Sequence, residues 1–84
     1  MNSYLALLDL LNKLNVRYNY SFNTKNRIET IHIPSLNISI ELIGNVLYVI
    51  NRWNTRKIEL PFKLGFTEHE IYMMNERNEI HIYG

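Results

Sequence analysis

The hydrophobic residues of this chain change their spacing shortly after the first dozen positions. Up to Leu14 they recur every three or four positions, and from Val16 onward most of them alternate with polar residues. The first spacing is typical of an amphipathic helix, and the second is typical of strands with one buried face. Ser3 is a suitable N-cap and Asn15 a suitable left-handed stop. We therefore expect a helix over 3–14, followed by a chain made mainly of strands.

Alternation and turn residues divide the rest of the chain into short strands. The pattern predicts strands over 16–22, 28–33, 36–42, 46–50, 57–60 and 79–83. Pro34 and Pro61 end two of them, and Gly44-Asn45 is a hairpin signal. The segment 46–50 is apolar at every position, which indicates a central strand covered on both faces.

The segment 68–75 has two interpretations. Thr67 and Glu70 have the spacing of a capping box, which predicts a short helix. Ile71 and Tyr72 fit a strand equally well, and 75–78 would then be a hairpin turn. We favour the helix because its first turn would be acidic.

The resulting order αβββββαβ predicts an α+β fold. We expect a mainly antiparallel sheet of five to six strands, with the N-terminal helix and the short second helix packed on one face. A chain of 84 residues corresponds to a single compact domain over 1–84.

Composition narrows the classes of function. Apolar residues make up 46% of the chain, charged residues 20%, and the net charge is +1, which argues against disorder and against a strongly basic protein that coats nucleic acid. The absence of cysteine excludes disulfides and favours a cytoplasmic location. We see no signal peptide and no membrane segment. The excess of Asn, Ile and Tyr, which have AT-rich codons, associates the chain with a phage or mobile element.

The polar residues show no recognisable catalytic or metal-binding pattern. His32, His69 and His81 lack the i, i+4 spacing of a helical zinc site. No Ser or Thr belongs to a recognisable triad, and the three glycines are too scattered to form a phosphate loop. We therefore expect no enzyme activity, no metal and no cofactor.

The strongest functional signal is the run 52–57, which holds the only tryptophan. Arg52, Trp53, Arg56 and Lys57 are the candidate partner-binding residues. Trp and Arg dominate protein-binding hot spots, and the same residues could instead stack a base and hold phosphates. The third interpretation is a polar turn whose tryptophan folds back onto the core.

From this run we expect a small non-catalytic binding protein that inhibits or modulates a macromolecular partner, most readily another protein. The alternative is a nucleic-acid-binding protein that adds Arg17 and Arg27 to the same loop.

The apolar surface of the helix bears on assembly. The apolar arc of the helix is about 220° wide, more than one covered sheet face requires. Leu5 and Leu10 at its margins either lie deep in a curved sheet or form a homodimer contact.

Tyr18, Tyr20 and Phe22 share one strand face, which we interpret as core under the helix rather than as a base-stacking platform.

Overall fold

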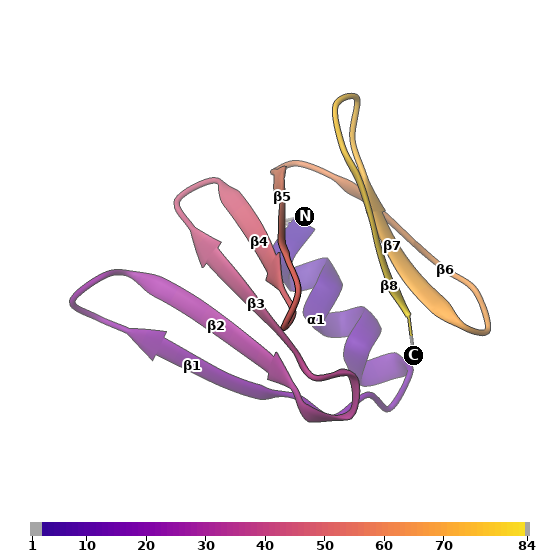
Figure 1. Cartoon of the computed structure of the whole chain (residues 1–84), viewed down its shortest axis with the longest axis horizontal. Helices are drawn as coiled ribbons and strands as arrows, with labels where there is room; N and C mark the ends of the chain where they lie inside the picture. The colour runs from indigo at the N-terminus through magenta and orange to yellow at the C-terminus, as the bar shows by residue number, and fades with distance from the viewer. Residues whose placement is uncertain (1–2, 84) are drawn as a thin grey trace.

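A computed structural model describes residues 3–83, which form one helix and two antiparallel sheets (Figure 1). The elements are α1 (Ser3–Lys13), β1 (Asn19–Asn23), β2 (Ile28–Ile33), the 3-10 turn η1 (Pro34–Leu36), β3 (Ile38–Ile43), β4 (Val46–Ile50), β5 (Thr55–Glu59), β6 (Lys63–Phe66), β7 (Glu70–Met74) and β8 (Glu79–Tyr83). Sheet one is a meander in the order β1-β2-β3-β4-β5, and sheet two has the order β6-β7-β8. The α+β class is confirmed, with the strands divided between two sheets.

A single apolar core joins the helix to both sheets. Helix α1 buries Tyr4, Leu7 and Leu11, whose spacing places them on one side of the helix. The strand residues in this core are Ile31, Ile33, Ile38, Ile40, Leu42, Leu47, Val49 and Ile58 from sheet one, and Ile71, Met73, Ile80 and Ile82 from sheet two. Alternation along each strand therefore gives each sheet an inner face in the core and an outer face.

The second helix predicted over 68–75 is wrong, because this segment contains strand β7. Thr67 and Glu70 do interact, but they close a hairpin: the Thr67 N–H donates to the Glu70 carbonyl at 2.8 Å. The Thr67 hydroxyl accepts the N–H of His69 at 3.3 Å. The same threonine-to-glutamate spacing serves a capping box and a tight turn, so the signal did not distinguish them.

The connection between β5 and β6 fastens the start of the helix to the two sheets. It contains a cis peptide bond between Leu60 and Pro61. The hydroxyl of Ser3 accepts the N–H of Phe62 at 3.1 Å and lies 3.2 Å from the carbonyl oxygen of the same residue, to which it donates. The Asn45 side-chain amide donates to the Leu60 carbonyl at 2.9 Å. The polar groups of this connection are thus satisfied by α1 and by the β3–β4 turn.

The predicted burial of Tyr18, Tyr20 and Phe22 is wrong for two of the three. Tyr18 packs against the core, but Tyr20 and Phe22 are 50% and 51% exposed. Their register opposite Ile31 and Glu29 puts them on the inner face, as expected. The β1–β2 hairpin extends away from α1 (Figure 1), and one helix about 10 Å wide covers only about two strand spacings. The edge strand therefore lies beyond its cover.

Candidate functional site

The β4–β5 turn holds Trp53 in a fixed backbone frame. The side-chain oxygen of Asn51 accepts the N–H groups of Trp53 and Asn54, each at 2.8 Å. The Asn51 N–H in turn donates to the Asn54 carbonyl at 3.0 Å. Trp53 is 81% exposed, so its ring does not fold back onto the core.

Arg52 and Trp53 form one exposed unit at this turn. The Arg52 guanidinium lies 5.4 Å from the centroid of the Trp53 ring, within cation–π range. Among residues 3–83, no carboxylate forms an ion pair with Arg52, so its positive charge faces solvent beside the indole. The turn therefore presents a flat apolar ring and a planar cation side by side.

The other two residues of the predicted site point elsewhere. Arg56 is half-buried on the inner face of β5, and its Nη1 donates to the His81 carbonyl of sheet two at 3.0 Å. Lys57 is exposed on the outer face of sheet one, opposite Tyr48. The structure thus brings Arg52 and Trp53 together, leaves Lys57 on an adjacent surface and directs Arg56 into the junction between the sheets.

The basic residues of the nucleic-acid alternative lie at two ends of sheet one. The register aligns Asn19, His32, Ser39 and Ile50 across the sheet, so Arg17 is at the end that carries the Trp53 turn. Arg27 belongs to the β1–β2 turn at the opposite end of these strands. A continuous basic track that includes Arg27 would have to run the length of the sheet.

The two helix residues considered for a homodimer contact differ in exposure. Leu5 is 55% exposed, whereas Leu10 is partly buried and packs against the core. A contact through α1 would therefore rest on Leu5.

The histidines make separate contacts. His81 has Nδ1 3.0 Å from Glu70 Oε2 and Nε2 3.5 Å from Glu79 Oε2, and its ring stacks on Tyr72 with centroids 5.7 Å apart. The hydrogen bond with Glu70 raises the pKa of His81. His32 Nδ1 lies 3.2 Å from Ser39 Oγ.

The third histidine, His69, is exposed in the β6–β7 turn, 3.9 Å from Glu68. Within residues 3–83, no cluster of three or more His, Cys, Asp or Glu residues is arranged to hold a metal ion.

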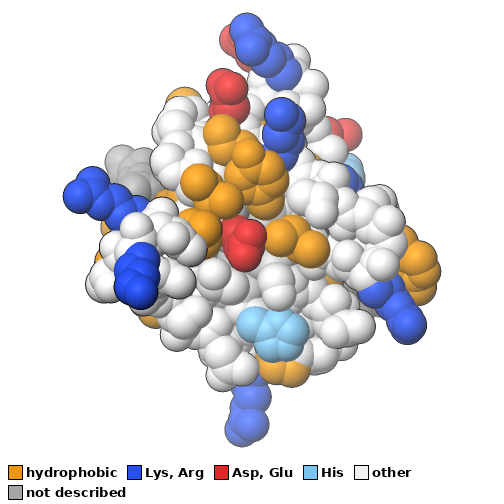
Figure 2. Space-filling view, turned by 60° about the vertical axis from the view of Figure 1, so that its left-hand side comes forward, with side chains coloured by type: hydrophobic (Ala, Val, Ile, Leu, Met, Phe, Trp, Pro, Cys, Tyr) orange, Lys and Arg blue, Asp and Glu red, His pale blue; other side chains and the backbone are white. Residues whose placement is uncertain are grey.

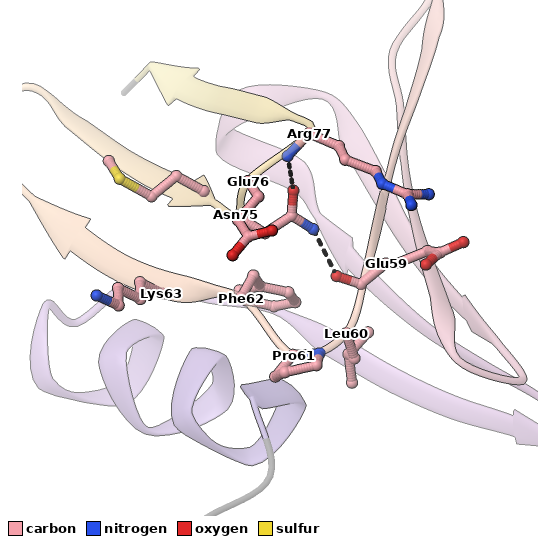
Figure 3. Close-up of a pocket in the computed structure, with 9 residues that line it drawn as sticks. Glu59, Leu60, Pro61, Phe62, Lys63, Asn75, Glu76 and Arg77 are labelled. Carbon is pink, nitrogen blue, oxygen red and sulfur yellow. Dashed lines mark hydrogen bonds between the residues drawn. The ribbon is translucent and has the colours of Figure 1, made fainter.

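A groove of about 650 Å³ lies at the junction of the two sheets (Figure 3). Leu60, Pro61, Phe62 and Met74 give it an apolar surface, and Asn75 closes one side by donating to the Glu59 carbonyl at 2.9 Å. Its charged residues are Glu59, Glu76, Lys63 and Arg77, so the two signs balance. The groove lies at the Glu59 end of β5, opposite the end that carries Trp53.

The outer face of sheet one is a further surface, which sequence analysis did not identify as one. Its apolar residues are Ile28, Ile43, Val46, Tyr48 and Ile50, by their register across the sheet. Figure 2 shows hydrophobic side chains gathered around an acidic one on this face. The sequence indicated this surface, because 46–50 is apolar at every position. The segment was expected to be covered on both faces, but no helix or strand within 3–83 covers its outer face.

Comparisons with protein-family models, curated proteins and solved structures return no match to this chain. Among the helices that the structure describes, none is long and apolar enough to span a membrane.

Proposed function

We propose that the chain is a small non-catalytic binding protein that attaches to a protein partner through Arg52 and Trp53 at the β4–β5 turn. The observation that carries this proposal is a tryptophan that is 81% exposed on a turn closed by three hydrogen bonds to Asn51 and Asn54. Exposure leaves the indole available, and the fixed turn limits the backbone entropy lost when a partner binds.

The chemistry of the pair fits a protein hot spot. Trp and Arg are the residues most often found at positions whose truncation costs about 2 kcal/mol or more of binding free energy. In this interpretation Trp53 fills an apolar pocket of the partner, and Arg52 pairs with a carboxylate at the rim of that pocket. Lys57 adds a second positive charge on the neighbouring outer face.

Two observations favour a protein partner over nucleic acid. The net charge of +1 supplies little long-range attraction for a polyanion. Arg27 lies at the far end of sheet one from Trp53, so the basic residues do not follow one groove. As part of the same proposal we place the protein in the cytoplasm, where a chain without cysteine is common, and we infer that it modulates its partner by covering a surface.

The proposal is tested by capture from a lysate of the producing cell with immobilised wild type, Trp53→Ala, Arg52→Ala and Phe66→Ala. Phe66 is the matched control because it is another aromatic residue that is 56% exposed. We expect the same proteins to bind wild type and F66A, and to be lost with W53A and R52A. Equal capture by all four chains would contradict the proposal.

A titration with DNA and RNA separates the alternative function. Trp53 is the sole tryptophan, so its fluorescence reports on the turn alone. Quenching by nucleic acid that weakens steeply with salt would establish nucleic-acid binding. We expect no such response, and quenching only with the captured protein.

A further inference from the structure

On the outer face of sheet one, the apolar strand β4 lies between β3 and β5, which both carry charged residues on this face. Val46, Tyr48 and Ile50 of β4 all point to this face, because the alternate residues Leu47 and Val49 are fully buried in the core. The neighbouring position Ile43 is 40% exposed. Contiguous apolar surface with a polar rim is typical of an interaction site on a small protein.

We propose that a second copy of this chain covers the face, with the two sheets packed together about a two-fold axis that runs along β4. In such a packing the strands of the two sheets are nearly aligned and the sheets lie about 10 Å apart. Tyr48 then lies on the axis, where it faces Tyr48 of the second copy. The apolar residues of β4 form the centre of the interface.

Charge complementarity selects this axis. The register places Glu41, Tyr48 and Lys57 in one row across β3, β4 and β5. A two-fold rotation about β4 exchanges the positions of β3 and β5, so Glu41 of each copy faces Lys57 of the other. The same rotation sets Ser39 opposite Thr55 and leaves Ile43 opposite Glu59 at the exposed margin.

A neighbouring axis would not have this complementarity. Rotation about β3 would set Glu41 against its own copy and bring two carboxylates together, and like charges that face each other are destabilising. A face with opposite charges symmetrically placed on either side of an apolar row is self-complementary, as an isologous contact requires. This pattern favours a second copy over an unrelated partner.

The size of the contact predicts its strength. Three paired strands of about five residues cover an area about 14 Å wide and about 17 Å long on each copy. Such an area, about 240 Å² on each copy, is smaller than that of stable specific interfaces, so we expect a weak, reversible dimer with a dissociation constant of about 0.1–1 mM.

Sedimentation equilibrium with a charge-reversal set tests the dimer. We expect wild type to approach twice the mass of 10.1 kDa as concentration rises. Glu41→Lys alone and Lys57→Glu alone should each weaken association at least about tenfold, because each sets like charges opposite each other. An equal mixture of E41K and K57E should regain the dimer, since every charged contact then joins opposite charges. The mixture also shows that both variants are folded.

Two control variants locate the contact. Lys63→Glu makes the same charge change on sheet two, and Leu5→Glu alters an exposed leucine of α1. Both variants should leave the dimer unchanged. A wild type that is still a monomer at about 1 mM, the weak limit of specific association, would overturn the proposal. So would a dimer that survives both single reversals, or a mixture that stays monomeric.

Discussion

Arg56 of β5 donates a hydrogen bond from Nη1 to the backbone carbonyl of His81 on β8, at 3.0 Å. This bond crosses from one sheet to the other, where the remaining contacts of the core are apolar. The Nε atom of Arg56 is buried and has no hydrogen-bond partner among residues 3–83. The arginine thus joins the two sheets, and its neighbours Arg52 and Trp53 form the exposed unit.

Replacing Arg56 should therefore destabilise the fold. We expect Arg56→Ala to lower the free energy of unfolding by about 1–3 kcal/mol, because it leaves a carbonyl of His81 without its charged donor. The measurement is urea denaturation followed by circular dichroism. Lys63→Ala is the matched control, since Lys63 is a basic strand residue that is exposed and lies outside the proposed contacts, and it should change stability by less than about 0.5 kcal/mol. Equal effects of the two variants would show that Arg56 does not join the sheets.

Gly65 is the position where the ring of Tyr72 crosses β6. A Cβ atom built on Gly65 would collide with the outer ring atoms of Tyr72. We expect Gly65→Ala to push this ring off His81, at a cost of about 1–3 kcal/mol, because extra volume in a packed site forces side chains away from their rotamers. The measurement is urea denaturation, with the Tyr72 and His81 ring resonances recorded by NMR.

A double-variant cycle isolates that collision. In a Tyr72→Ala background the ring is gone, so adding G65A should lower the free energy of unfolding by less than it does in wild type. If the two changes add without coupling, the ring does not set the cost at Gly65.

The sequence predicted the faces of the strands better than the ends and cover of the sheets. Alternation placed Ile38, Ile40 and Leu42 on a buried face, and the structure confirms it. The same alternation placed Tyr20 and Phe22 on the inner face, but it could not show that one helix is too narrow to reach the edge strand. Burial of an edge depends on the width of what covers it, which local periodicity does not encode.

Local structure explains why the helix predicted over 68–75 is wrong and why Arg56 of the predicted site points inward. Thr67 and Glu70 have the spacing of a helix cap, but their hydrogen bonds close the β6–β7 hairpin. Arg56 belongs to the same basic run as Arg52, but Arg52 lies in the β4–β5 turn. Arg56 lies in β5, where its register opposite the buried Val49 puts it on the inner face. The sequence run identified Trp53 and Arg52 as candidates, and tertiary structure separated them from Arg56.

The contact of His81 with Glu70 makes part of the stability depend on pH. The hydrogen bond with Glu70 raises the pKa of His81 above its ordinary value of 6.5. Because the folded-state pKa is the higher one, this contribution is present below pH 6.5 and is lost as the pH rises through the folded-state pKa. We expect Glu70→Gln to lower the pKa of His81, measured by NMR titration of its ring protons.

The same variant changes the pH profile of unfolding. The free energy of unfolding of wild type should exceed that of E70Q by more at about pH 5.5 than at about pH 9. Glu68→Gln is the control, because Glu68 contacts His69 and not His81, and it should leave the His81 titration unchanged. A His81 pKa that does not respond to E70Q would contradict the assignment.

Asn51 and Asn75 build the same kind of turn in the two sheets, which provides a matched test of the binding turn. Each side-chain oxygen accepts the backbone N–H groups two and three residues ahead. Asn51→Ala should cost about 0.5–2 kcal/mol, as the loss of comparable side-chain caps does, and it should free the backbone around Trp53. We expect faster local motion of Trp53 in time-resolved fluorescence anisotropy and weaker binding of the captured partner.

Asn75→Ala removes the equivalent hydrogen bonds in the β7–β8 turn, beside the groove at the junction of the two sheets. It also removes the hydrogen bond to the Glu59 carbonyl. It should lower stability at least as much as N51A, yet leave the anisotropy of Trp53 and partner binding unchanged. Asn51→Asp, which keeps the accepting oxygen, should behave like wild type in both measurements. If N51A binds the partner as tightly as N75A does, the fixed presentation of Trp53 is not what the partner recognises, because a loss of overall stability is common to both variants.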